Sequence, residues 1–382
     1  MNVFNSLIDQ SEVIEILKEA VKSAQKLNDS SQVMTNTWLF TGPPGSGRSN
    51  AAIAFAAALV CKEGGCSKCN DCLSTIIGTH ADVELIKTEG LSIKIDEIRE
   101  LITRASWAPS VASYRVVVIE DSDRLTESAA NALLKVIEEP GLRTIWLLCA
   151  PTLTDVLPTI RSRCRHLSLR TPSTKAVANL LIERESIDPK TAEFAARAAG
   201  GHIGRARRLA TDENAKQNRS RILKLPLTIK DVTSAYKAAQ FLVDAAKADA
   251  LKDSEKKDED EISKLKEAWG ATGSKMVSGG AKVVKELEKE QKSRATRMVR
   301  DYLDRALLDL ATLYRDVLLV QSGSSDNLIN QDIKDEINKI ASSTTEAKML
   351  LNIQSILRAR INLMHSSATL LTMEALMLEL KG

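Results

Sequence analysis

The sequence predicts an α/β fold with a doubly wound parallel sheet, and three observations support this prediction. Residues 42–49 read Gly-Pro-Pro-Gly-Ser-Gly-Arg-Ser, which fits a glycine-rich phosphate loop at all fixed positions except one. A short apolar run at residues 38–40 precedes the loop, and an alanine-rich helical run at residues 50–60 follows it. Further along, four β-branched residues at 116–119 end in two acids, as is typical of a central parallel strand.

Length and composition narrow the class of protein. A chain of 382 residues should hold two or three domains with a sizeable core. The net charge of +3, from 53 basic and 50 acidic residues, argues against a dedicated nucleic-acid binder with a strongly basic face. The N-terminal segment lacks the pattern of a secretory signal, and the longest apolar run, residues 51–61, is too short to cross a bilayer. We therefore expect a cytoplasmic protein with no membrane contact, whose six cysteines are thiols or metal ligands.

The phosphate loop is expected to hold a nucleotide, because small residues let backbone N–H groups point at phosphate oxygens beside a helix N-terminus. The usual lysine is replaced by Arg48, which keeps the charge on a wider planar group. Binding and hydrolysis are therefore separate questions. The residues expected to contact a nucleotide are Gly42, Pro43, Pro44, Gly45, Ser46, Gly47, Arg48, Ser49 and Asn50.

Four cysteines, Cys61, Cys66, Cys69 and Cys72, lie within twelve residues directly after the phosphate-loop helix. Their C-x4-C-x2-C-x2-C spacing can place four thiolates around one tetrahedral zinc ion. No histidine lies in this stretch, so the site would be all-sulfur, closed and structural. The alternative is a group of unligated thiols. The other two cysteines are expected to be core residues.

The two acids after the predicted strand at residues 114–119 are Glu120 and Asp121. In a phosphate-loop ATPase, one such acid arranges magnesium and the next polarises the attacking water. The usual order is Asp then Glu, so here each carboxylate is displaced by about one C–C bond, which can cost on the order of 100-fold in rate. The alternative is that the two acids only cap a strand.

Three further segments are informative together. Residues 131–140 read Asn-Ala-Leu-Leu-Lys-Val-Ile-Glu-Glu-Pro, in a helix that Thr126 should cap and Pro140 should end, and residues 162–164 read Ser-Arg-Cys. Residues 4–10 carry Phe-x-x-Leu-Ile-x-Gln before a helical pattern, which also fits an ordinary amphipathic helix. With the cysteine cluster, these motifs resemble the δ′ family of bacterial DNA polymerase III clamp-loader subunits and, less closely, the γ/τ family. The resemblance covers residues 1 to about 210.

The resemblance implies a three-part architecture. Residues 1–168 would form an AAA+ nucleotide-binding-like domain with a zinc module at about 61–72. Residues 169–212 would form a small helical lid, and residues 213–382 an all-α collar for oligomerisation with a charged insertion at about 246–292.

The resemblance also implies a role in DNA replication, as the stator subunit of a complex that loads the sliding clamp onto primed DNA. Partners would be γ/τ and δ subunits in a heteropentamer, with the clamp and primer–template DNA reached through the complex. Arg163 of the Ser-Arg-Cys triplet would act in trans as an arginine finger on the ATP of a neighbouring γ subunit, worth roughly 10³ to 10⁵ in rate.

Three departures from the ATPase pattern predict that the chain itself does not hydrolyse ATP. Besides Arg48 and the reversed acids, Gly204 stands where the family has a sensing arginine, and Arg205 follows one place later, turned by about 100°. Because the loop glycines and Ser49 are intact, ATP or ADP with Mg²⁺ could still be bound. The alternative is an active γ/τ-like ATPase. A zinc-dependent DNA-binding module on an inactive ATPase is a third hypothesis, which the near-neutral charge disfavours.

The C-terminal half is expected to be helical. Residues 246–292 are rich in charged residues, glycine and serine, and predict a mobile insertion. Lysines 282, 285, 289 and 292 could contact primer–template DNA, but the glutamates interleaved with them favour a solvated helix. Apolar residues then recur with helical spacing at residues 303–317 and 353–380, which predicts buried faces.

Overall fold

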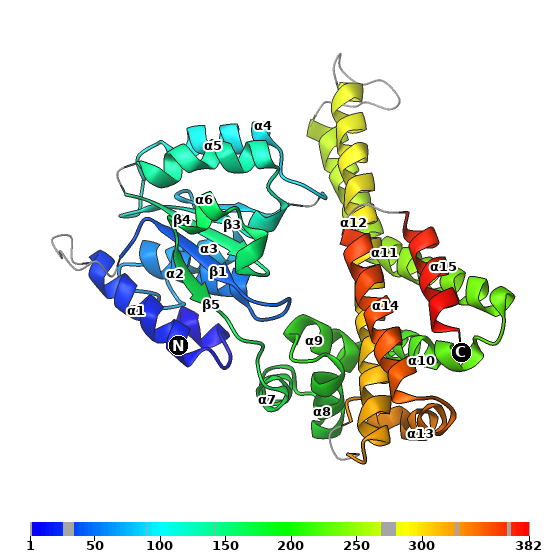
Figure 1. Ribbon diagram of the computed structural model, residues 1–382. Helices are drawn as coiled ribbons and strands as arrows, with labels where there is room; N and C mark the ends of the chain where they lie inside the picture. Colours follow the sequence, from blue (N-terminus) through cyan, green and yellow to red (C-terminus); the bar gives the residue numbers. More distant parts are fainter. Residues whose placement is uncertain are drawn as a thin grey trace. The chain divides into compact units, whose positions relative to one another are not determined.

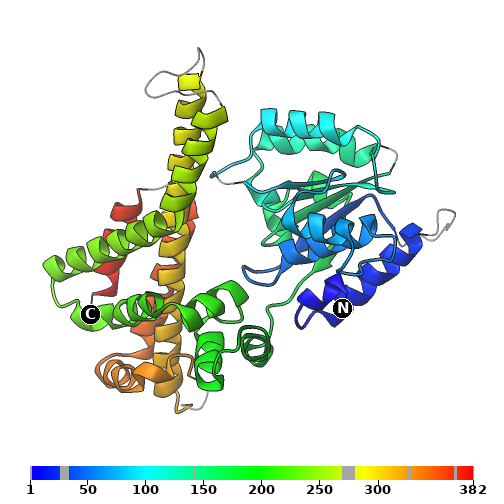
Figure 2. The same cartoon turned by 180° about the vertical axis from the view of Figure 1, so that it is seen from behind.

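A computed structural model describes residues 2–25, 34–88, 90–141, 143–268, 280–324, 328–364 and 368–381. The chain divides into two compact units, Met1–Arg207 and Arg208–Gly382 (Figures 1 and 2). The three-part division, with boundaries at residues 168 and 212, stays a prediction. Within the described ranges, no helix is both long and apolar enough to span a bilayer.

The first unit contains a five-stranded parallel sheet with the strand order β2-β3-β4-β1-β5. All residues of β1, β3 and β4 are buried, as expected for strands that are covered on both faces. The predicted doubly wound parallel α/β sheet is therefore confirmed. The strands are β1 (Thr37–Thr41), β2 (Val83–Ile86), β3 (Arg115–Ile119), β4 (Thr144–Ala150) and β5 (Arg165–Ser168).

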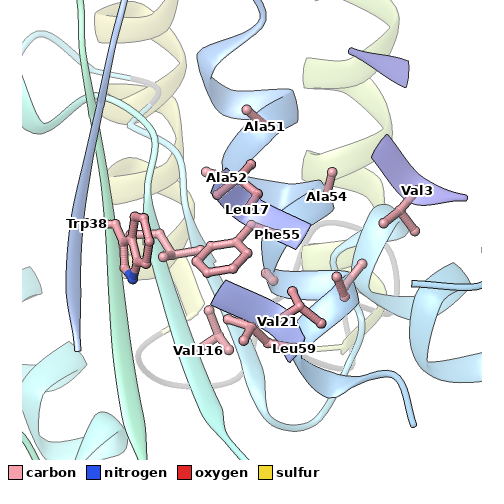
Figure 3. Close-up of a cluster of buried hydrophobic side chains, with 14 of the residues drawn as sticks. Val3, Leu17, Val21, Trp38, Ala51, Ala52, Ala54, Phe55, Leu59 and Val116 are labelled. Carbon is pink, nitrogen blue, oxygen red and sulfur yellow. The ribbon is translucent and has the colours of Figure 1, made fainter. Parts of the chain in front are cut away.

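Helices cover both faces of this sheet (Figure 1). Trp38 and Phe40 of β1 belong to the core on one face, whereas Leu39 belongs to the core on the other face, because successive side chains of a strand alternate. Figure 3 shows Phe55 of α2 beside Trp38, with the two ring centroids 5.1 Å apart. The first face carries η1 (Val3–Ser6), α1 (Ser11–Gln25), α2 (Arg48–Val60) and α3 (Asn70–Ile77), and the second carries α4 (Ile95–Ala105), α5 (Glu127–Glu138) and α6 (Pro158–Arg161).

Two local signals in the sequence make defined contacts in the first unit, and the helix cap at Thr126 was predicted. The Thr126 hydroxyl accepts a hydrogen bond from the N–H of Ala129 at 3.3 Å and so caps α5. In the N-terminal signature, Phe4 is buried in the core, and the side-chain amide of Gln10 donates to the carbonyl of Arg170 and accepts from its N–H. Gln10 therefore ties the start of the chain to the segment that leaves β5.

After β5 the chain is helical. The helices are α7 (Thr174–Glu185), α8 (Pro189–Ala198), α9 (Ile203–Thr211), α10 (Glu213–Thr228), α11 (Val232–Ala268), α12 (Gly280–Gln321), α13 (Lys334–Ser343), α14 (Glu346–Met364) and α15 (Thr369–Leu380). The predicted apolar stripe from Leu303 to Val317 lies on α12 and is buried in the core of the second unit. Arg219 of α10, only 3% exposed, donates to Asp309 of α12 at 3.1 Å within that unit.

The predicted insertion at residues 246–292 is helical in its described part, and its mobility stays a prediction. Residues 246–268 belong to α11 and residues 280–292 to α12. Charged residues of the two helices form ion pairs with each other. The buried Arg294 of α12 contacts Asp258 and Glu261 of α11. Charge density alone could not reveal this pairing, since it depends on the partner helix. The glycines and serines at residues 270–274 and 278–279 lie outside the described residues.

Asp82, the residue directly before the edge strand β2, is a buried carboxylate with several hydrogen-bond donors around it. It accepts hydrogen bonds from the backbone N–H groups of Ser110, Val111 and Ala112 at 2.7–2.8 Å, and from the Ser110 hydroxyl at 2.9 Å. Arg115 lies 3.6 Å away. Burial by itself raises the pKa of Asp82, but these hydrogen bonds outweigh burial and lower the pKa to about 2.

Asp82→Asn is expected to lower the free energy of unfolding by about 2 kcal/mol at neutral pH, because the amide would place N–H groups against N–H groups. A carboxylate with a lowered pKa stabilises the fold above its unfolded pKa of 3.8 and loses this effect as the pH falls through about 2. Urea unfolding of the wild type and the variant at several pH values tests this. The gap between them should shrink below pH 4, and a gap that does not change with pH would contradict the assignment.

Candidate functional site

The glycine loop connects the end of β1 to the first residue of α2, as a phosphate site requires. Gly45 and Gly47 have φ angles of 89° and 86°, a backbone region that favours glycine. Gly47 precedes α2, and its carbonyl accepts from the N–H of Ala51 at 2.8 Å. Of the nine residues predicted to bind a nucleotide, Gly42 and Ser46 are buried, Gly45, Gly47, Arg48 and Ser49 are half-buried, and Pro43, Pro44 and Asn50 are exposed.

Arg48, which replaces the usual lysine, points back at its own loop. Its Nη1 donates to the carbonyl of Gly42 at 2.8 Å. Its Nε is buried and has no hydrogen-bond partner among the described residues. One N–H donor of the guanidinium is therefore hydrogen-bonded to the loop backbone. In a typical phosphate loop, the lysine ammonium at this position is directed at phosphate instead.

The two acids after β3 lie close to Arg48, although the sequence separates them by more than seventy residues. Because β4 lies between β1 and β3, the ends of the three strands meet at one edge of the sheet. All three charges act on the buried thiol of Cys149 in β4: burial raises its pKa most, Arg48 lowers it, and Glu120 and Asp121 raise it further. The structure thus brings Arg48, Glu120 and Asp121 together.

Asp123 is a third acid at this edge that sequence reasoning missed. Burial, and then the negative charge of Asp121, raise the pKa of its carboxyl group, while Arg124 and Arg48 lower it. Its Oδ1 is buried without a hydrogen-bond partner in the described part of the chain. The pattern Glu-Asp-Ser-Asp at residues 120–123 carried the signal, but a third acid has no place in the usual two-acid motif.

Gly204, which stands at the sensor position, lies on α9, and the start of this helix lies next to the phosphate loop. A Cβ atom on Gly45 would lie 2.6 Å from Cγ of His202, so only glycine fits at position 45. The N–H of Arg205 donates to Nδ1 of His202 at 3.2 Å, and His202 thereby caps α9. His202 is thus the residue of this motif in contact with the loop. Whether Arg205 points away from a phosphate stays a prediction.

The four clustered cysteines converge, with their sulfur atoms all within 4.8 Å of one another. Sγ of Cys61 lies 3.8 Å from that of Cys66 and 3.6 Å from that of Cys69. Four sulfurs bound to one tetrahedral ion at about 2.3 Å would lie about 3.8 Å apart, so these positions fit such an ion. The cluster can therefore hold one metal ion.

The backbone around this cluster also fits a thiolate site. The N–H groups of Cys69 and Cys72 point at the sulfurs of Cys66 and Cys69, at 3.3 and 3.4 Å. Burial raises the pKa of Cys61, but backbone N–H groups that include those of Cys66 and Gly65 lower it to about 7. Gly65 has a φ angle of 102°, so the turn that directs these groups needs glycine. Such donors stabilise the deprotonated sulfur that a metal requires.

Each residue of the Ser-Arg-Cys triplet has its own physical role just after α6. Cys164 packs against the core, and burial raises the pKa of its thiol to about 12. The Ser162 hydroxyl donates to the carbonyl of Thr159 at 3.1 Å. The Arg163 side chain is 40% exposed, and its Nη2 lies 2.6 Å from the carboxylate of Glu138. A half-buried cysteine that packs against the core therefore lies next to an exposed arginine.

Sequence comparison with known proteins identifies the family of this chain. The sequence profile of the family "DNA polymerase III, delta subunit" matches residues 10–173, and the profile of its C-terminal part matches residues 299–381. The DNA polymerase III subunit delta' of Bacillus subtilis is 28% identical over 337 residues, which cover 87% of each chain. The chain belongs to the DNA polymerase III delta-prime family. The two profiles fall in the two compact units, one in each.

Similarity to other proteins of this group is more partial. The DNA polymerase III subunit gamma/tau of Mycobacterium tuberculosis is 32% identical over 178 residues, which cover 44% of this chain and 31% of that protein. A solved structure of a DNA polymerase III gamma subunit-related protein from Thermotoga maritima covers 89% of this chain and 99% of its own, at 18% identity and a TM-score of 0.36. That TM-score is too low to support a functional comparison.

Proposed function

We propose that this chain is the δ′ subunit of a bacterial DNA polymerase III clamp loader and acts in DNA replication. In this proposal it assembles in the cytoplasm with γ/τ and δ subunits into a heteropentamer that loads the sliding clamp onto primed DNA. Membership of the delta-prime family over most of both chains supports the proposal. One combination of observations carries the proposal. Arg163 is exposed, whereas Arg48 in the chain's own nucleotide site is hydrogen-bonded to the backbone of its own loop.

Arg163 is proposed to work as an arginine finger in trans. Such a finger must reach phosphate oxygens on another subunit, which requires a cation at the surface on a rigid support. The exposure of Arg163 meets the first requirement, and the buried Ile160 and the half-buried Cys164, which packs against the same core, meet the second. The finger would stabilise the charge that develops on the phosphates of the neighbour's ATP.

The chain's own nucleotide site is proposed to bind without hydrolysing. The glycine loop retains its positive φ angles, which supports residual binding of ATP or ADP with Mg²⁺. Three features oppose hydrolysis: Arg48 is occupied by the carbonyl of Gly42, Glu120 and Asp121 stand in reversed order, and Gly204 stands at the position of the sensing arginine. The alternative, an active γ/τ-like ATPase, requires this site to hydrolyse ATP despite all three of these features.

The cysteine cluster is proposed to hold a structural zinc ion. The four sulfurs form a closed, all-cysteine set, the kind of site in which zinc stabilises a fold and has no open position for a substrate. Cys72 is fully buried, and its helix α3 packs against α2. The ion would hold α3 against the helix that begins at the phosphate loop.

Reconstitution tests the proposed function directly. The chain is combined with γ/τ and δ subunits of the same organism, and transfer of a labelled sliding clamp to primed DNA is measured with and without it. We expect loading only in mixtures that contain the chain, together with co-migration of the chain with γ/τ and δ. Equal loading in its absence would contradict a role in the clamp loader.

A further inference from the structure

Glu138, the last residue of α5, has no role in the function proposed so far, yet among the described residues it is the ion-pair partner of Arg163. One carboxylate oxygen of Glu138 lies 2.6 Å from Nη2 of Arg163. Nη1 of the same arginine donates to the carbonyl of Thr159 at 2.8 Å and lies 3.3 Å from the Ser162 hydroxyl. The guanidinium is therefore held at two of its nitrogens, from two different elements.

The fold brings this pair together through buried neighbours. Ile137 precedes Glu138 and is 5% exposed, and Ile160, three residues before Arg163, is 1% exposed. Both belong to the core cluster that α5 and α6 share, against which Cys164 also packs. The two charged side chains are thus carried on anchored backbone, while they themselves remain 48% and 40% exposed.

An ion pair this exposed contributes little to stability, because water and salt screen the attraction and both side chains lose rotamer freedom. Its physical effect is on orientation. A free arginine side chain at a surface samples many rotamers, and a catalytic cation that is displaced by about 1 Å can lose on the order of 100-fold in rate. Two fixed contacts remove much of this freedom, and a guanidinium with five N–H donors still has donors left for a phosphate.

We infer that Glu138 is a positioning residue, which holds the Arg163 guanidinium in the orientation that meets the neighbouring subunit's ATP. This inference rests on the proposed function of Arg163. It gives a physical role to the first glutamate of the Glu-Glu-Pro sequence at residues 138–140.

The test is a double-mutant cycle in the reconstituted complex, with single-turnover hydrolysis of ATP at the site that adjoins this chain as the readout. Glu138→Gln keeps the shape of the side chain and removes its charge. We expect the rate at saturating ATP to fall about tenfold, with no change in the ATP concentration that gives half the maximal rate, because positioning acts in the transition state. In an Arg163→Ala background, Glu138→Gln should have no further effect.

Glu139→Gln is the matched control, because it makes the same charge change at the adjacent exposed residue and should leave the rate unaltered. Assembly of every variant into the complex is checked by co-migration. An unchanged or faster rate for Glu138→Gln, or an equal loss in the Arg163→Ala background, would overturn the positioning role alone. If Arg163→Ala itself left hydrolysis unchanged, the proposed finger would fall, and the role of Glu138 with it.

Discussion

Arg163→Ala is expected to slow hydrolysis at the adjoining ATP site on the order of 10³-fold when the variant replaces the wild-type chain in a reconstituted complex. The reason is electrostatic: an exposed cation that stabilises charge developing on transferring phosphate has no substitute once it is removed. The variant should still fold, because the side chain is 40% exposed and its polar contacts within the described part of the chain are those to Glu138, Thr159 and Ser162. Single-turnover kinetics can measure the affected site as a separate phase.

Arg161→Ala is a suitable control for this experiment. Arg161 is the last residue of α6, two positions from Arg163, and its removal changes the net charge by the same amount. A loss specific to Arg163 would show that position, rather than charge alone, determines the effect. A rate for Arg163→Ala within about twofold of wild type would contradict the finger assignment.

Removal of the metal is expected to cost several kcal/mol of stability in the first unit, because metal binding and folding of such a site are coupled. The purified chain should contain about one zinc ion, and Cys69→Ser should lose it together with part of the packing of α3 on α2. Metal analysis and thermal unfolding with and without a chelator measure both effects. Both the loss of zinc and the loss of stability should be measurable in the isolated chain, without any partner subunit.

Cys149→Ala is the control for this experiment, because it removes a cysteine that lies outside the cluster. Cys149 is buried in β4 outside the cluster, so its replacement should leave the metal content unchanged. A wild-type chain that carries no metal, and whose unfolding temperature does not respond to a chelator, would show that the four cysteines are unligated thiols.

Much of the first unit could be predicted from the sequence because its signals are local. The glycine loop, the β-branched strand at residues 115–119 and the capped helix that Thr126 begins each fix their structure through neighbouring residues. The cysteine spacing likewise predicts the convergence of four sulfurs, since all four ligands come from one short stretch.

The features that the sequence did not reveal depend on partners that are distant along the chain. The helical state of residues 246–268 is supported by Arg294 on α12, and no pattern within the segment specifies that partner. The contact of His202 with Gly45 and the pairing of Glu138 with Arg163 join different elements in the same way. Asp123 was missed for another reason, because burial of a carboxylate is a property of the packed fold.

The most direct test of the central claim compares Arg48→Ala with Arg163→Ala in the same reconstituted complex, with the rate of ATP hydrolysis as the readout. If the chain acts on its neighbour's ATP and not on its own, Arg163→Ala lowers the rate at the adjoining site on the order of 10³-fold, and Arg48→Ala leaves all phases within about twofold of wild type. The reverse result, a loss with Arg48→Ala and none with Arg163→Ala, would contradict this claim and identify an active ATPase.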